Sequence, residues 1–324
     1  MGSTVHSPDS ATRMAVTPPP SPGVGLRYTG ELAALGTAVC FGSGANLFAA
    51  AGRRMGSHVL NRLRIAVAFV LLTVALRVST GAWWPSWASG EALIALSLSG
   101  MVGFVFGDAW NFRAMVILGP GRASLLASTA PLFTTALAWP ILHQAPGPLA
   151  LLGMVLVFTG VGFAITDRSR RQAAHSAEGS EAMGILSGLL GAIGQAGGMV
   201  LSKVGLRTGL DPLPATVIRV AAALLLLWAM TIAQRNVRHT LGALRDGRGT
   251  AFMVGGAFVG PFLGVTLALT ALHHIEAGVA ASITAVAPLV AMALAVRFHG
   301  ERLTWRTALG ALIAVAGVIA LFRR

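Results

Sequence analysis

One acidic residue, Asp108, stands within a long apolar stretch of the chain and is the sharpest candidate for chemistry. Asn111 follows three residues later, so on a helix the carboxylate and the amide share one face. The two groups could bind a cationic group or take up a proton. Alternatively, Asp108 could pair with Arg64 or Arg113 and serve only to fix helix packing. An ionisable group in an apolar span is costly, so both roles are predicted to involve a partner.

Three further polar residues in apolar stretches are candidates for a solute or ion pathway. Ser43 and Asn46 stand three apart and could donate hydrogen bonds to a solute, but bonding to a neighbouring helix is the favoured interpretation. Lys203 lies near the end of its stretch, where lysine side chains usually extend to the lipid headgroups. A role for Lys203 in binding substrate is the alternative.

Gln195 belongs to a stripe of small residues that recur every three or four positions and therefore share one helix face. The stripe consists of Gly184, Gly188, Gly191, Gln195, Gly198 and Ser202. It could line a cavity, with Gln195 as its strong hydrogen-bonding group, or it could form a close helix contact. The sequence favours the contact and leaves a solute-binding role for Gln195 open.

A second glycine series, at Gly256, Gly260 and Gly264, includes a proline at Pro261. Glycines at intervals of four permit close helix approach, and a proline inside a helix predicts a kink. The neighbouring polar residues Thr266 and Thr270 extend this region as pathway candidates. Two more prolines within apolar stretches are predicted to act as structural or hinge positions, namely Pro131 and Pro288.

The composition explains why these residues stand in apolar surroundings. Of the 324 residues, 55% are hydrophobic and only 11% are charged, and the mean hydropathy is +0.73. These values are typical of a protein that has a lipid bilayer as its solvent. The net charge of +13 does not indicate nucleic-acid binding, because the cations separate apolar stretches and do not gather on a solvated face. The single cysteine, Cys40, excludes an internal disulfide and a cysteine-rich metal site, and we expect neither a metal nor a cofactor.

The apolar stretches predict an all-α integral membrane protein with about ten transmembrane helices, since about 20 apolar residues are needed to cross a bilayer. The predicted helices are 30–51, 59–79, 91–114, 121–142, 148–166, 183–205, 213–233, 250–272, 278–297 and 304–322. Residues 1–28 are rich in proline and are predicted to form a disordered tail. A polar linker at 167–182 divides the helices into two halves of five, 29–166 and 183–324.

The two halves repeat each other at an offset of 157 residues. The offset brings glycines and prolines into register, as with Gly103 and Gly260 or Pro131 and Pro288. Near the start of each half the offset drops slightly, so that Arg64 corresponds to Arg219. An odd number of spans in each half predicts that the halves are inverted relative to each other. Inverted repeats place a solute site at their interface, near the middle of the membrane.

With these features the chain resembles the drug/metabolite transporter superfamily, specifically its EamA-type ten-helix members. The resemblance extends over about residues 30–322. The features that carry it are Phe41-Gly42-Ser43, the paired Arg64 and Arg219, the motifs Ala130-Pro131-Leu132 and Ala287-Pro288-Leu289, the closing Gly153 to Gly160-Val161 and Gly310 to Gly317-Val318, and Gly300-Glu301. The first half has His143-Gln144 where the second has Gly300-Glu301, which departs from the pattern.

The resemblance and the repeat predict a secondary transporter that moves a small metabolite, amino acid or drug-like solute by alternating access, with Asp108 as a candidate for proton coupling. An acid at Asp108 favours cations or protons over free anions, unless it faces lipid headgroups or an arginine. The sequence has no nucleotide-binding Gly-x4-Gly-Lys-Ser/Thr, His-Glu-x-x-His or Gly-x-Ser-x-Gly motif. We therefore expect no enzyme; the alternatives are a membrane scaffold or receptor and, less favoured, an intramembrane enzyme.

The expected location is the cell membrane, with several crossings and both termini on the same side. The resemblance implies a cytoplasmic side for the termini. Most of the 24 lysine and arginine residues, however, fall in the connections and helix ends of the opposite side, and the positive-inside rule then places the termini outside. The orientation stays open, as does the choice between monomer and homodimer.

Overall fold

The computed structural model describes residues 28–118, 123, 126–172, 181–299 and 305–322, and all regular structure in these ranges is helical. Residues 1–27 of the predicted tail at 1–28, residues 173–180 of the predicted linker at 167–182 and the Gly300-Glu301 motif lie outside the described residues.

Six of the described helices are long and apolar enough to cross a membrane. Four are α1 (Thr29–Met55), α2 (Ser57–Thr80), α8 (Glu181–Leu206) and α9 (Pro212–Ala233). The other two are composite, since each changes from α to π geometry and back. They consist of α3 (Gly90–Gly100), η1 (Met101–Gly107) and α4 (Asp108–Leu118), and of α11 (Gly247–Ala257), η3 (Phe258–Gly264) and α12 (Val265–His274).

The remaining helices of the bundle have shorter apolar stretches. They are α6 (Ala130–Leu142), α7 (Pro148–Gln172), α13 (Ala277–Thr284), α14 (Ala287–His299) and α15 (Trp305–Phe322). A short α10 (Val237–Gly242) and a 3-10 turn η2 (Ala243–Arg245) occupy the arginine-rich connection before α11, where no helix was predicted. The all-α layout in two repeats therefore fits the described residues, which contain six long apolar helices and four shorter apolar stretches, Ala130–Leu142, Pro148–Phe163, Ala277–Ala291 and Ala308–Phe322.

The sequence prediction of unbroken helices over 121–142 and 278–297 is wrong. The chain forms turns at Ser128–Thr129 and again at Ala285–Val286, directly before α6 and α14. Proline lacks the N–H that a helix interior requires, but it is tolerated in the first turn, where that N–H has no intrahelical partner. Pro131 and Pro288 each stand second in a new helix, so each proline marks the start of a helix in place of a kink within one.

The repeat is visible in the bounds of the elements. Met101–Gly107 and Phe258–Gly264 are both π-helical, and they are related by the offset of 157 residues found in the sequence. The starts of α6 and α14 and those of α7 and α15 follow the same offset. A π-helical turn is rare and is retained mostly where function uses it. Its recurrence at the same place in both halves marks the middle of the third helix of each half.

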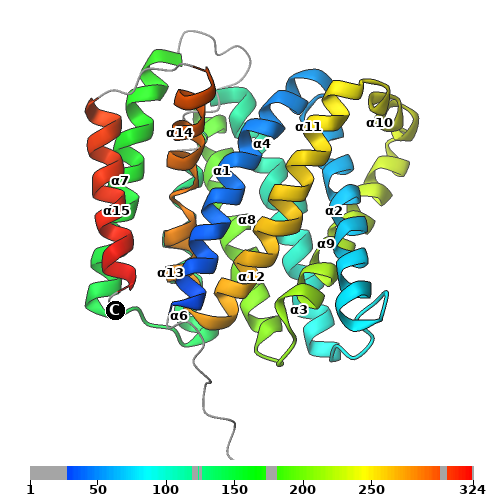
Figure 1. Ribbon diagram of the computed structural model, residues 1–324, viewed down its shortest axis with the longest axis horizontal. Helices are drawn as coiled ribbons and strands as arrows, with labels where there is room; N and C mark the ends of the chain where they lie inside the picture. The colour runs from blue at the N-terminus through cyan, green and yellow to red at the C-terminus, as the bar shows by residue number, and fades with distance from the viewer. Residues whose placement is uncertain (1–27, 119–122, 124–125, 173–180, 300–304, 323–324) are drawn as a thin grey trace, which may run out of the picture.

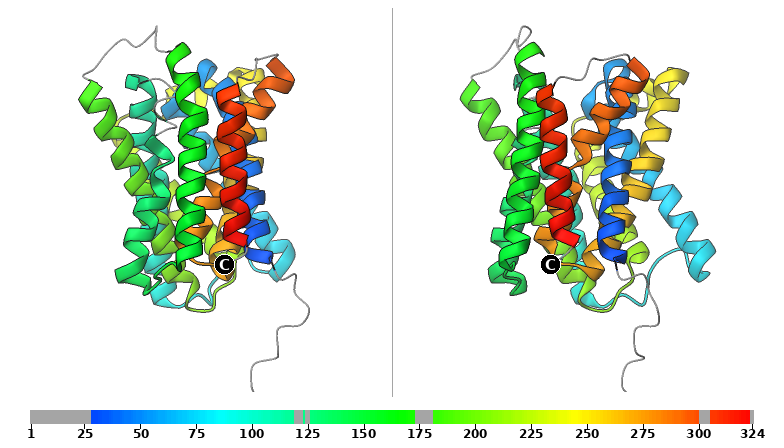
Figure 2. Two further views of the ribbon diagram at one scale, coloured as in Figure 1. Left: turned by 90° about the vertical axis from the view of Figure 1, so that its left-hand side faces the viewer. Right: turned by 60° about the vertical axis from the view of Figure 1, so that its left-hand side comes forward.

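Each half contacts the other through its first and third helices. α8, the first helix of the second half, packs along α3, η1 and α4, while α1 packs along α11, η3 and α12. Figure 1 shows α1 beside α11 and α12, and Figure 2 shows the same bundle from two further sides. The described chain begins in α1 and ends in α15 at the same end of the bundle (Figure 1). This arrangement agrees with both termini lying on one side of a membrane.

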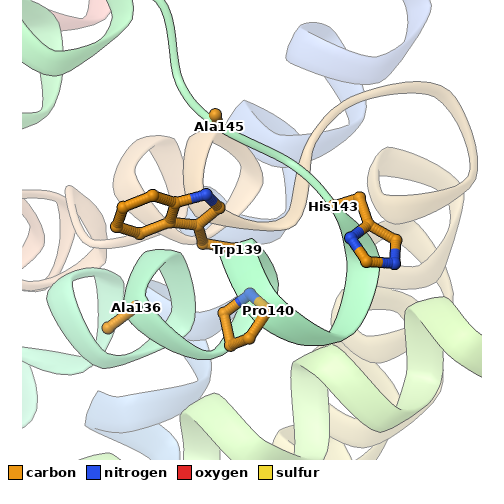
Figure 3. A pocket seen from close by; sticks show the side chains of 5 residues that line it. All are labelled: Ala136, Trp139, Pro140, His143 and Ala145. Atoms are coloured by element: carbon orange, nitrogen blue, oxygen red, sulfur yellow. The ribbon is translucent and has the colours of Figure 1, made fainter.

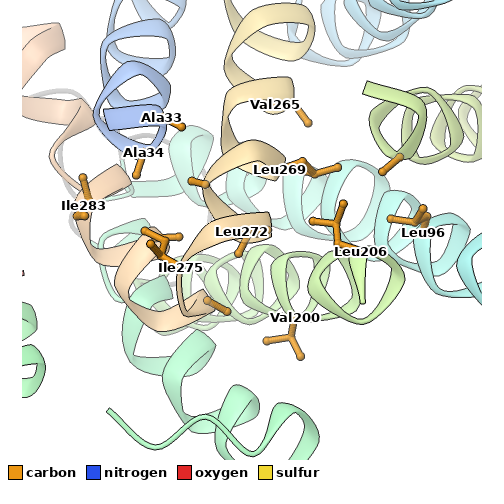
Figure 4. Close-up of a cluster of buried hydrophobic side chains, with 14 of the residues drawn as sticks. Ala33, Ala34, Leu96, Val200, Leu206, Val265, Leu269, Leu272, Ile275 and Ile283 are labelled. Carbon is orange, nitrogen blue, oxygen red and sulfur yellow. The ribbon is translucent and has the colours of Figure 1, made fainter. Parts of the chain in front are cut away.

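The hydrophobic core joins elements of both halves. Figure 4 shows side chains from α1, α3, α8 and the α12–α13 corner around one buried cluster. Its labelled members are Ala33, Ala34, Leu96, Val200, Leu206, Val265, Leu269, Leu272, Ile275 and Ile283. The outer faces are also apolar: on α2 the residues Val70, Val74 and Val78 are all exposed at intervals of one turn. An apolar outer surface of this kind is compatible with lipid around the bundle.

Helices α7 and α15 pack side by side at one edge of the bundle (Figures 1 and 2) through glycines. A Cβ atom on Gly317 would lie 2.6 Å from the backbone nitrogen of Val157, and one on Gly160 would collide with the backbone of Ala314. Neighbouring atoms of a backbone cannot move aside as a flexible side chain can. The two helices are therefore held at glycine-to-backbone contact distance.

Replacing Gly160 by alanine is expected to separate α7 from α15 and destabilise the protein by about 1–3 kcal/mol, which is the usual cost of overpacking. Thermal unfolding of the purified protein in detergent measures the effect. Gly90→Ala is the matched control, because Gly90 also lies in a helix but a Cβ there meets no atom within 4 Å. An equal melting temperature for Gly160→Ala and wild type would contradict this contact.

Candidate functional site

The carboxylate of Asp108 lies at the start of α4 and is bound by side chains from two other helices. Arg64 of α2 donates from Nη2 to Oδ2 of Asp108. Gln195 of α8 donates from Nε2 to Oδ1 over 2.8 Å. Asp108 is only 9% exposed, so both of its oxygens depend on these partners inside the protein. The predicted alternative in which Asp108 pairs with Arg64 is thus the geometry found.

A second layer of contacts holds these partners in place. Asn61 accepts a hydrogen bond from Nε of Arg64 over 2.8 Å and donates to the carbonyl of Phe104 over 3.4 Å. Gln195 also donates to the carbonyl of Gly103 over 3.3 Å. Both carbonyls belong to η1, whose π geometry changes the helical hydrogen-bonding pattern. The π segment therefore serves as an anchor for side chains from α2 and α8.

A second arginine, Arg219 of α9, lies in the same region and is 6% exposed. Its guanidinium stacks over the ring of Phe104, with 5.0 Å between Cζ and the ring centroid. Nε of Arg219 is buried and has no hydrogen-bond partner among the described residues. We call Asn61, Arg64, Asp108, Gln195 and Arg219 the polar cluster. It contains two guanidinium groups and one carboxylate.

Glycines bring the backbones of α8 and η1 close enough for the polar cluster to form. A Cβ atom on Gly194 would lie 2.6 Å from Cα of Gly107, and one on Gly198 would lie 3.0 Å from Cα of Gly103. Further along, the hydroxyl groups of Ser99 and Ser202 lie 2.7 Å apart. The stripe on α8 is confirmed as a close helix contact, and Gln195 within it reaches Asp108.

Two further pathway candidates of the first helix bond to backbone. Asn46 donates from Nδ2 to the carbonyls of Gly42, over 3.3 Å, and of Ala291 in α14, over 3.4 Å. Ser43 donates to the carbonyl of Val39 within its own helix, over 2.6 Å. The hydrogen bond to α14 matches the favoured interpretation of Asn46 as a contact between helices. Asn111 lies in α4, where its backbone contacts Gly191 of α8.

The candidates around α12 also donate to main-chain carbonyls. Thr266 donates to Phe262 over 2.6 Å, and Thr270 donates to Thr266 over 2.9 Å. Lys203 donates to the carbonyls of Leu272 and of Ile275, the latter over 2.9 Å. A cation at the C-terminal end of a helix is stabilised by the helix dipole. Lys203 thus joins α8 to the end of α12.

The glycines of α11 and η3 accommodate aromatic side chains of α1. A Cβ on Gly256 would lie 2.5 Å from the ring of Phe48, and one on Gly264 would lie 2.7 Å from the ring of Phe41. Gly260 contacts both Phe48 and the backbone of Gly44. The predicted close approach is confirmed. Pro261 lies inside η3, although η1 has π geometry without any proline.

Sequence reasoning placed Asp108 and Gln195 in separate candidate groups and gave Asn61 no role. The repeat relates Arg64 to Arg219 as residues at the openings of corresponding helices. The repeated arginine and the predicted alternative that Asp108 pairs with Arg64 are the sequence signals for this cluster. The offset shows that the two arginines are equivalent, but not that both approach the same acid.

The outer face of α6 carries a hollow of about 500 Å³. Figure 3 shows its lining by Ala136, Trp139, Pro140, His143 and Ala145, from the end of α6 and the segment that follows. The lining is largely apolar and does not include any residue of the polar cluster. Among the described residues, no group of three histidine, cysteine, aspartate or glutamate side chains is arranged to hold a metal ion.

Comparisons with known proteins give the family. The family model described as the EamA-like transporter family matches the chain twice, over residues 28–166 and 182–323. The chain belongs to the EamA-like transporter family. It is therefore a multi-pass membrane transporter of the drug/metabolite superfamily, as the resemblance implied.

The fold is similar to that of a solved structure titled only "Crystal structure of protein". The match has a TM-score of 0.70 and 15% sequence identity, and it covers 91% of this chain and 96% of that one. An identity this low shows the fold alone. No curated protein sequence matches this EamA-like chain.

The ion pair of Arg64 and Asp108 is expected to be strongly coupled. Arg64→Gln or Asp108→Asn alone leaves a buried charge without its partner, at a cost of about 3 kcal/mol. The double variant loses both charges and is expected to be more stable than the sum of the two losses, by about 1–3 kcal/mol. Unfolding of the four proteins in detergent measures this coupling, and additive losses would contradict it.

Proposed function

We propose that this protein is a secondary transporter in which the polar cluster forms the solute-recognition centre between the two halves. One observation carries the proposal. The cluster takes Asn61, Arg64 and Asp108 from the first half and Gln195 and Arg219 from the second. Burying three ionisable groups costs more stability than an apolar core of the same shape. A membrane scaffold does not need buried ionisable groups, whereas a carrier uses such groups to recognise its solute.

The repeat supports alternating access as the mechanism. The first helix of each half packs on the π segment of the third helix of the other half, so the two interfaces are related by the repeat. If the halves are inverted, exchange of their conformations converts an opening on one side of the membrane into an opening on the other. The cluster lies at one of these interfaces. Movement of α8 along η1 would therefore change access to Asp108 and the groups around it.

Charged and polar side chains also join the halves at one end of the bundle. Arg54, at the end of α1, donates from Nε to Oδ2 of Asp246 over 2.5 Å. Arg62 of α2 donates to Oε1 of Gln234 over 2.8 Å and to Oγ1 of Thr240 over 3.2 Å. We call the contact of Arg54 with Asp246 the latch. A contact of this kind between halves has to break when that end opens, so we propose that it contributes to gating.

Asp108 is the acid of the polar cluster, so we propose it as the group through which a proton gradient would act. Protonation would remove the negative charge that holds Arg64 and would leave Arg64 and Arg219 as uncompensated positive charges. Such a change would couple the protonation state to the ion pair that joins α2 to α4. Asparagine at this position keeps the shape of the side chain but removes the titration.

Uptake and efflux of pooled metabolites, amino acids and drug-like solutes by proteoliposomes test the proposed function. We expect wild type to move one solute class and to respond to two opposite pH gradients, whereas Asp108→Asn loses the response to the gradient. Thr73→Val, which alters a hydroxyl that donates to the carbonyl of Phe69 within α2, is the control. Absence of movement for every solute would overturn the carrier, and a response to pH that survives in Asp108→Asn would overturn coupling through Asp108.

The latch is expected to influence the transport rate without being required for folding. Asp246→Asn is expected to change the initial uptake rate about two- to fivefold, since exposed ion pairs contribute little. Exchange of the charges by Arg54→Asp with Asp246→Arg is expected to restore much of the wild-type rate. Equal rates in Asp246→Asn and wild type would contradict a gating role.

The pH dependence of the latch is set by the pKa of Asp246. Hydrogen bonds from Arg54 and from the backbone N–H of Gly249 lower the pKa of Asp246 below its ordinary 3.8. A lowered pKa means that the ion pair is fully present above that value and is lost only as the pH falls through the lowered pKa. The latch therefore stays intact over the range of the transport assays, from about pH 5 to 8. Any response to pH in that range has to come from another group.

A further inference from the structure

The polar cluster holds one more positive charge than negative charge. Arginine keeps its proton at any physiological pH, so Arg64 and Arg219 contribute two positive charges against the one negative charge of Asp108. The oxygens of Asp108 already accept hydrogen bonds from Arg64 and Gln195. Arg219 has no such bond to Asp108 and keeps a buried Nε without a partner among the described residues. A buried unpaired donor is rare and calls for an explanation.

The repeat identifies which group is missing. α2 and α9 correspond, so Arg64 and Arg219 are equivalent, and α4 and α12 correspond, so the equivalent of Asp108 is Val265. Asp108 and Val265 are each the first residue of their helix and directly follow a π segment. α9 packs against α12, as the pairing of Arg64 with Asp108 joins α2 to α4. In the second half, the arginine is kept while the acid is replaced by a buried valine that is 4% exposed.

The surroundings of Arg219 leave it suited to an anion. Stacking over Phe104 fixes the plane of the guanidinium, and stacked arginines keep their N–H groups available at the edge. A Cβ on Gly103 would lie 3.5 Å from Nη2 of Arg219, so the neighbouring residue has no side chain that could cover this edge. The planar array of donors matches a carboxylate in a bidentate arrangement.

We propose that the solute carries a carboxylate and that this carboxylate binds Arg219 in the place of the acid missing at position 265. The inference rests on the proposed function of a carrier and adds the substrate class to it. A single carboxylate brings the cluster to neutrality. A phosphate monoester carries about −1.5 to −2 charges at neutral pH and would leave an excess of negative charge. The preference for cations expected from Asp108 is thereby corrected, because that acid is already held by Arg64.

The first test measures binding to the purified full chain and does not depend on transport. Lactate is compared with lactamide, and acetate with acetamide, at equal concentration and at constant ionic strength. We expect the carboxylates to raise the melting temperature and the amides, which have the same shape without the charge, to leave it unchanged. Arg219→Gln is expected to abolish the shift, and Arg219→Lys to retain part of it. No difference between acid and amide would overturn the inference.

The second test supplies the missing acid within the protein. Val265→Asp is expected to pair with Arg219, to raise the melting temperature relative to Val265→Asn and to remove the response to lactate. Val265→Asn is the matched control, because asparagine has almost the same volume as aspartate and is also polar, but carries no charge. If the response to lactate survives in Val265→Asp to the extent that it does in Val265→Asn, Arg219 is not the carboxylate site.

The third test separates failure of this inference from failure of the carrier. Proteoliposomes receive a mixture of labelled sugars, polyamines, amino acids and hydroxy acids, with the carboxamide of each acid as its partner. We expect at least one acid to enter about tenfold faster than its carboxamide, and Val265→Asp to abolish that preference. Movement of sugars or polyamines alone keeps the carrier and overturns the carboxylate. If no solute moves, the carrier itself is wrong, and the melting experiments alone decide whether Arg219 binds a carboxylate.

Discussion

The close contact of α8 with the π segment η1 is the constraint on which the site depends. Glycines on both sides bring the two backbones within van der Waals distance, as at Gly194 and Gly107. Without Cβ atoms between them, the helices can approach until Gln195 bonds to both the carbonyl of Gly103 and the carboxylate of Asp108. In a bilayer, where the hydrophobic effect does not drive helices together, this packing and these hydrogen bonds supply the attraction. Separation of α8 from η1 would therefore release the cluster and the interface together.

The π geometry of η1 has a second role, because it provides carbonyl groups that accept hydrogen bonds from side chains of other helices. A π turn leaves the regular i to i−4 bonding pattern, and in η1 two carbonyls accept side-chain donors, from Asn61 at Phe104 and from Gln195 at Gly103. The corresponding segment η3 contacts the aromatic ring of Phe48 in α1 and has no acid after it. The two halves thus use one backbone design for different purposes. The first half holds the acid, and the second half provides an arginine without one.

This asymmetry matters for a carrier. If each half contained a complete ion pair of arginine and acid, no charged group would be available to bind a solute. Arg64 is satisfied by Asp108 and Asn61, and it stacks near Phe48, with 5.0 Å to the ring centroid. Arg219 is more deeply buried than Arg64, but its stacking partner Phe104 supplies no charge. Electrostatic attraction in a site that excludes water is strong. We therefore infer that recognition of an anionic group is concentrated in the second half, which has Val265 at the position that corresponds to Asp108.

The amino-acid sequence by itself determined the membrane class, the helical content and the repeat, because these depend on the length of apolar stretches and on glycines and prolines at a constant spacing. It also identified Asp108 and Gln195 as polar groups in costly positions. It failed at 121–142 and 278–297, since hydrophobicity does not distinguish a continuous helix from two helices joined by a turn. Only the tertiary structure decided that Arg64 and Gln195 meet at Asp108, that Arg219 lies nearby over Phe104, and that Asn46, Thr266 and Lys203 bond to main-chain carbonyls. The physical reason is that a helix pattern specifies which residues share a face, whereas the partner of that face depends on how closely glycines allow other helices to approach.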